Sequence, residues 1–111
     1  MANIFRTFTS RNIGTSLTSV GNFNSPGANV STVIGLAISN KSNSAILVDV
    51  AHASNTANTF IIKNAPITAG STLVPIGGDQ KIVLHGESIK VSANSAGAVD
   101  AVMSVLIQNG A

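Results

Sequence analysis

The sequence predicts an all-β protein folded as a single β-sandwich domain. Apolar residues alternate with polar or small ones along most of the chain, as in TVIGLAIS at 32–39 and AILVDVAH at 45–52. Such a period of two places apolar side chains on one face of a half-buried strand. Turn-forming stretches rich in Gly, Asn and Ser recur about every 8–12 residues, a spacing typical of sandwiches and barrels. The length of 111 residues fits one domain.

The alternation predicts about eight antiparallel strands. Their expected ranges are 4–9, 13–20, 32–39, 45–52, 59–64, 71–76, 80–84 with 87–92, and 98–108. Counting 80–92 as two strands would give nine.

The N-terminal segment combines apolar residues with cations. Residues 1–40 contain two arginines and no acidic residue. Apolar anchors flanked by cations are typical of interface segments. We therefore expect 1–12 to be an N-terminal arm or an edge strand, with 13–111 forming the β-sandwich domain. The candidate partner interface is Ile4, Phe5, Arg6, Phe8 and Arg11. The alternative is that the two arginines are simply solvated.

The central strands supply most of the expected core. The polar stretch SNKSNS at 39–44 predicts a hairpin connection, Pro66 and Gly70 bracket a bend, and Gly77-Gly78-Asp79 favours a tight turn. The side chains expected to face inward are Ile34, Leu36, Ile38, Ile46, Val48, Val50, Phe60, Ile62, Ile82, Leu84, Ile89, Val91, Val105 and Ile107.

The last segment, 98–108, is compatible with two structures. Asp100, Ser104 and Gln108 recur every four residues, which is helix-like. Three valines and an isoleucine in the same segment are stiff at χ1 and favour a strand. We expect a strand.

Composition argues against several classes of function. Charged residues make up 9% of the chain, against about 25% in an ordinary soluble domain. The six cations are scattered and there is no Trp or Tyr, so nucleic-acid binding is not expected. There is no cysteine for disulfides or thiolate sites. With neither a secretory signal nor an apolar run long enough to span a membrane, the protein is expected to stay in the cytoplasm or in a particle assembled there.

The titratable side chains do not suggest a reaction centre. No nucleophile-elbow motif surrounds any serine, so a catalytic triad is not indicated. His85 and Glu87 flank Gly86, which predicts a solvated turn, and two ligands are fewer than a metal site needs. His52 ends an apolar strand and is expected to be exposed or capping. We expect no catalytic residue, metal, cofactor or small-molecule substrate.

Several segments together resemble a family pattern. They are VIGLAISN (33–40), AILVDV (45–50), IIKNAPITAGSTL (61–73), GGDQKIVLHGESIKV (77–91) and VMSVLIQ (102–108). The run resembles small virion structural proteins of tailed bacteriophages, whose pattern is KNAPIPAGSSL followed by GGDQKIVL-x-x-GD-x-IKV. Gly86-Glu87 replaces the usual Gly-Asp, and Ile67-Thr68 replaces the usual Ile-Pro. In length and composition the chain is similar to the capsid decoration proteins, also called cement or staple proteins, of short-tailed phages.

This resemblance implies a jelly-roll-like fold and a place on the capsid surface of a virion made in the host cytoplasm. The implied partners are the major capsid protein and further copies of the chain, as a dimer or trimer. The protein would bridge neighbouring capsid subunits and stabilise the head.

Two alternatives remain open at this point. The first is a tail, neck or fibre-attachment component of the virion, which sequence does not separate from decoration. The second is a carbohydrate-binding β-sandwich, which the lack of Trp and Tyr disfavours because sugar rings stack on such side chains.

Overall fold

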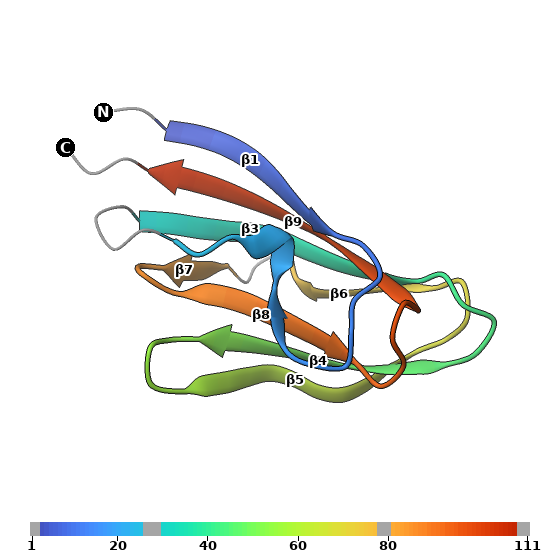
Figure 1. Ribbon diagram of the computed structural model, residues 1–111. Coiled ribbons are helices and arrows are strands. Elements are labelled where there is room, and N and C mark those ends of the chain that lie inside the picture. Colours follow the sequence, from blue (N-terminus) through green and yellow to red (C-terminus); the bar gives the residue numbers. More distant parts are fainter. Residues whose placement is uncertain (1–2, 26–29, 78–80, 109–111) are drawn as a thin grey trace.

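The computed structural model describes residues 3–25, 30–77 and 81–108, and in these ranges the chain forms nine strands in two antiparallel sheets (Figure 1). The first sheet has the order β1 (Asn3–Ser10), β9 (Val99–Gln108), β3 (Val30–Asn40) and β6 (Thr72–Ile76), and β7 (Ile82–Leu84) also pairs with β3. The second sheet has the order β2 (Thr18–Ser19), β8 (Ser88–Ala93), β4 (Ile46–Ala53) and β5 (Asn58–Ile67). A short 3₁₀ helix, η1 (Val20–Asn22), follows β2.

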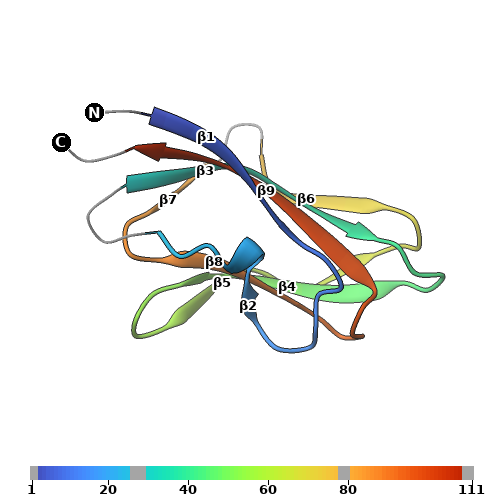
Figure 2. The same cartoon turned by 45° about the horizontal axis from the view of Figure 1, so that its top comes forward.

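The strand order is that of a jelly roll. If β6 and β7 are counted as two parts of one strand, the strands pair first with last: β1 with β9, β2 with β8, β3 with β6 and β7, and β4 with β5. This is the arrangement of a long antiparallel hairpin rolled into two facing sheets. Figure 2 shows the two layers and the connections that cross between them. The predicted all-β sandwich is therefore confirmed.

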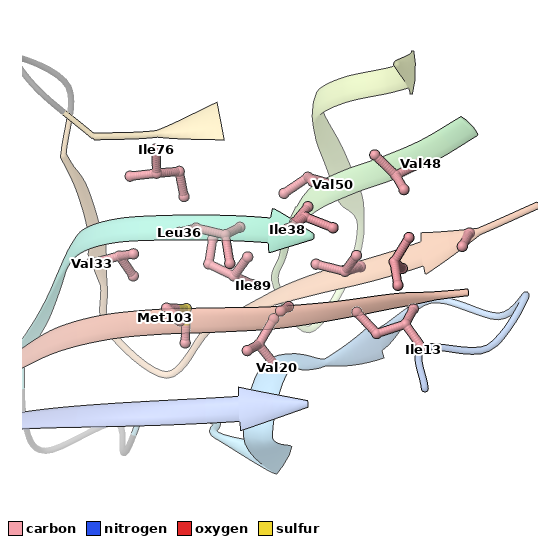
Figure 3. Close-up of a cluster of buried hydrophobic side chains, with 14 of the residues drawn as sticks. Ile13, Val20, Val33, Leu36, Ile38, Val48, Val50, Ile76, Ile89 and Met103 are labelled. Carbon is pink, nitrogen blue, oxygen red and sulfur yellow. The ribbon is translucent and has the colours of Figure 1, made fainter. Parts of the chain in front are cut away.

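The core lies between the two sheets and is aliphatic. Val33, Leu36 and Met103 of the first sheet face Val50 and Ile89 of the second, and all five are at most 1% exposed (Figure 3). Segment 98–108 was compatible with strand or helix, and it is a strand, as expected. On its inward side Val99, Ala101, Met103 and Val105 are fully buried and Ile107 is partly buried.

The prediction that Ile34 faces the core is wrong, and a β-bulge is the reason. In the pairing of β3 with β9, Val33 lies opposite Val105 and Gly35 opposite Ser104, so Ile34 is an extra residue. A bulge shifts the alternation by one position. Val33 and Leu36 are consequently both buried, and Ile34 is only half-buried.

Phe60 was also predicted to face the core, and this too is wrong. The register of β5 against β4 shifts, so that Val50 lies opposite Ile62 whereas Ala51 lies opposite Phe60. This places Phe60 on the outer face of the second sheet, where it is 43% exposed. Ile62, Ile82 and Ile107 are partly buried and pack against the core, and the remaining predicted core residues are buried.

The predicted strand 13–20 is mostly irregular. Only Thr18 and Ser19 pair with β8, after which Gly21 and Asn22 adopt left-handed backbone angles that end the extended conformation. Ile13 instead hydrogen-bonds through its backbone to Val99 and Gly97 in and before β9. Of the turn predicted at Gly77-Gly78-Asp79, the last two residues lie outside the described ranges.

The stretch 39–44 is not a hairpin, because β3 and β4 belong to different sheets. Asn40, which is 2% exposed, holds this crossing in place. Its Nδ2 donates to the carbonyl oxygens of Ser44 (2.7 Å) and Ile67 (2.8 Å), and its Oδ1 accepts from the backbone N–H and the hydroxyl of Ser42. One buried amide therefore fixes both the β3–β4 crossing and the end of β5.

Candidate partner-binding surface

The five predicted interface residues do not form one patch. Ile4, Phe5, Arg6 and Phe8 all lie on β1, whose eight residues pair with β9 without a register shift. Side chains of a strand alternate between its faces. Because Arg6 and Phe8 lie opposite the buried Val105 and Met103, the even-numbered residues face inward and Phe5 faces outward.

The inward side chains of β1 close one side of the sandwich. Phe8 stacks on Phe23 with ring centroids 4.3 Å apart, and Phe23 is 9% exposed. The Arg6 guanidinium lies 5.5 Å from the centroid of the Phe8 ring, a cation–π contact. Phe8 and Arg6 are thus engaged within the chain, whereas Ile4 is 43% exposed at the open end of the sandwich.

Arg11 lies beyond β1, beside a carboxylate. Asp100 accepts a hydrogen bond from the Asn12 N–H (2.9 Å) and forms an ion pair with Lys41 (3.0 Å). The Asn12 bond outweighs burial, and with Lys41 and Arg11 it lowers the pKa of Asp100. Arg11 also lines an open pocket of about 210 Å³ whose walls include Ile13, Val20 and Val91. Arg11 is therefore not part of the surface to which the outward side chain of Phe5 belongs.

Phe5 instead belongs to the outer face of the first sheet, which is apolar and exposed. One cross-strand row runs Phe5, Leu106, Thr32, Val83, and a second contains Val102. Phe5 is 73% exposed, Val83 57% and Val102 46%, and β6 adds Val74 at 60%. We call the exposed set Phe5, Val74, Val83 and Val102 the apolar face.

The apolar face is almost without charge. The other outward positions paired in this sheet are Leu106, Val30 and small or uncharged polar residues (threonine, serine, alanine, glycine, asparagine and glutamine), and among those described Asp100, at the far end, is the one ionisable residue. Several large apolar side chains exposed on one sheet face, with small or uncharged residues between them, are a feature of interaction sites. A signal for this face was present in the sequence, because Val102 and Leu106 are apolar on the side of 98–108 opposite the buried side chains.

The outer face of the second sheet differs in charge. Lys63 forms an ion pair with Asp49 (3.1 Å) and lies 4.5 Å above the ring of Phe60, and Lys90 pairs across from Ala51. Burial raises the pKa of Asp49, but hydrogen bonds from the Asn64 N–H and from Lys63 outweigh it, and the pKa is lowered. The two broad faces therefore offer a partner different chemistry: one neutral and apolar, the other charged.

His52 and Glu87 meet at one end of the sandwich. His52 Nε2 lies 3.2 Å from Glu87 Oε1, which also accepts from the His85 N–H at 3.2 Å. The His85 bond is the main reason that the pKa of Glu87 is lowered. Gly86 has a left-handed φ of 75°, so residues 85–87 form the predicted turn. His52 was expected to be exposed or capping, and it is half-buried and paired.

Within the described residues, no group of three histidine or acidic side chains could hold a metal ion. The same part of the chain has no helix long and apolar enough to cross a membrane. Comparison of the sequence with protein-family models and with curated proteins finds no match.

Proposed function

We propose that the protein is a structural component of a bacteriophage virion, a decoration protein that binds the outside of the capsid through its apolar face. The exposure of Phe5, Val74, Val83 and Val102 on a single sheet face that is almost without charge carries this proposal. The sequence resemblance across 33–108 supplies the class of particle, and the jelly-roll order of the strands agrees with it.

The mechanism follows from contact area rather than from chemistry at a site. A stable protein interface buries about 1,600 Å² in total. A protein seated across two major capsid subunits opposes their separation, and weak contacts repeated over a shell add through multivalency. The apolar face suits this role because its burial removes apolar area from water without stripping charges of their hydration. The charged face of the second sheet would then remain in solvent.

A paired substitution tests which face binds. Val102 and Phe60 are similarly exposed, at 46% and 43%, but lie on opposite faces. We expect Val102→Glu to lose binding to capsids that lack the protein, and Phe60→Glu to bind like the parent, with both variants keeping the parent's β-sheet circular dichroism. Equal binding by both variants, or a loss with Phe60→Glu alone, would contradict the assignment.

Copy number in purified particles tests the location. A shell protein is present in hundreds of copies, whereas a tail, neck or fibre-attachment component is present in a few dozen at most, because closed symmetric rings set its number. Quantitative mass spectrometry of the particles distinguishes the two. Specific binding on a glycan array, with no particle association, would instead favour a carbohydrate-binding module.

A further inference from the structure

Among the described strands, the edges of the two sheets differ in how they are protected. β2 has two residues, β6 contains Pro75, and β7 has three residues. β5 is long but carries Lys63, Pro66, a left-handed Asn64 and shifts of register. Short strands, lysine, proline and bulges are the usual means of preventing edge-to-edge pairing. β1 has eight residues in continuous register with β9 and contains neither proline nor lysine, and its one charged residue, Arg6, is engaged with the Phe8 ring of the same strand.

Only part of the β1 edge is accessible. η1 packs against its second half: the Gly21 N–H donates to Ser10 Oγ at 2.7 Å, and a Cβ added at Gly21 would lie 2.7 Å from the Cβ of Phe8. Residues 3–7 and the outward-facing Thr9 are exposed, whereas Phe8 and Ser10, which η1 contacts, are half-buried. An incoming strand therefore has five residues, Asn3–Thr7, available to it.

We propose that this edge pairs with the same edge of a second copy, antiparallel about a two-fold axis that passes beside Phe5. A strand is the occupant that an open sheet edge selects, since it satisfies the free backbone N–H and C=O groups. A second copy presents the same edge, and a two-fold pairing closes without leaving a further edge to extend.

The side chains of β1 select the register. If the two sheets continue as one, outward residues must lie opposite outward residues, so the axis passes beside a residue and not between two. Centring on Ile4 would pair only Asn3–Phe5 of the described residues, which leaves Phe5, Arg6 and Thr7 as candidates. Centring on Arg6 would place two guanidinium groups directly opposite, which is unfavourable. Centring on Thr7 would require the half of the strand that η1 covers. Centring on Phe5 pairs the two Phe5 rings on the outer face and sets each Arg6 opposite Ile4 of the other copy.

Such a dimer joins two first sheets, and their apolar faces then form one surface. The pairing stands on the geometry of the edge and not on the proposed function, and the isolated protein tests it without any particle. For the decoration role, one dimer would present two binding faces held in a fixed relation, as bridging neighbouring capsid subunits requires.

Cysteine cross-linking tests the register, because the chain has no cysteine of its own. In the Phe5-centred register the two residues at position 5 have Cα atoms about 4.5–5.5 Å apart, within the span of a disulfide. The two residues at position 7 are about 13 Å apart along the strands. We expect Phe5→Cys to give a disulfide-linked dimer with diamide as oxidant and Thr7→Cys to remain unlinked. Both positions are exposed, so both variants should melt like the parent when reduced.

Sedimentation provides a second measurement that needs no oxidant. The parent protein should be a dimer, and Phe5→Asp should raise its dissociation constant at least about tenfold by placing like charges across the axis. Val102→Asp, on the same face but away from the edge, should leave the dimer intact. Linking of Thr7→Cys in place of Phe5→Cys would overturn the register. A parent that is monomeric alone, and whose Phe5→Cys variant links only to another virion protein, would overturn pairing with a second copy.

Discussion

Replacing Asn40 by alanine tests how the two sheets are connected. The side chain makes four hydrogen bonds, two as donor and two as acceptor, while 2% exposed. Each such bond contributes a net of about 0.5–1.5 kcal/mol, and a buried group left without a partner costs about 1–3 kcal/mol. Water can replace part of the bonding in the exposed loop at Ser42 and Ser44, but the carbonyl of Ile67 loses its amide partner beside the core. We expect Asn40→Ala to lower the free energy of unfolding by about 2–4 kcal/mol.

Urea unfolding measures this loss, and Asn94→Ala is the matched control. Asn94 lies in another connection between the sheets, is exposed, and accepts one hydrogen bond, from the Leu47 N–H at 3.0 Å. Its loss should cost at most about 1 kcal/mol. The midpoint for Asn40→Ala should fall with an unchanged slope, since the same surface is exposed on unfolding. If the two variants differ by less than about 0.5 kcal/mol, Asn40 does not act as the common support of the two connections.

Three further predictions concern the core, a carboxylate and a glycine. Leu36→Ala should cost about 2–5 kcal/mol in urea unfolding, whereas Phe60→Ala should cost no more than about 1 kcal/mol; equal losses would contradict the register of β5. The pKa of Asp49 is lowered in the folded state, so the ionised carboxylate stabilises the fold above its ordinary pKa, and this stabilisation is lost as pH falls through the folded pKa. Asp49→Asn should therefore lose less stability than the parent on acidification, and identical profiles of unfolding free energy against pH would contradict this. Gly21→Ala should lower the melting temperature, because φ is +61° and the new methyl meets β1, whereas Gly14→Ala has open space and should not; matching melting temperatures would refute this.

The fold class could be predicted from the alternation of apolar and polar residues, because every second side chain of a strand faces the core. The period does not reveal where a bulge or register shift changes which residues of a strand face the core. The bulge at Ile34 and the register shift between Phe60 and Ile62 each change which face the neighbouring side chains take. Neither shift can be located from the sequence, because the consecutive apolar residues at these points, Val33-Ile34 and Phe60-Ile61-Ile62, are compatible with either phase of alternation. The number of strands was predictable, but the crossing at 39–44 was not, because the amide of Asn40 acts through contacts with the distant Ile67.

The candidate surface was predictable for one residue and missed elsewhere for a physical reason. Phe5 stands out in the sequence as a large apolar residue near cations, and it is the most exposed member of the apolar face. Val74 and Val83 come from segments that are distant in sequence, and only the rolled topology brings them onto the same sheet. Arg11 was grouped with Phe5 by proximity in the chain, although its position after the end of β1 places it beside Asp100.

Because side chains alternate between the two faces of β1, this strand both closes the core and contributes to the outer surface. Experiments on binding must therefore change one of these faces without the other. Phe8 points inward and stacks on Phe23, and the next residues support η1, so the second half of the strand belongs to the core. Phe5 points outward and makes no such contact with the core, since 73% of it is exposed. Deleting residues 2–12 would remove both halves together, and a loss of binding would then be inseparable from a loss of folding. A change confined to Phe5 separates them, because the side of the strand that holds the sandwich closed is left as it was.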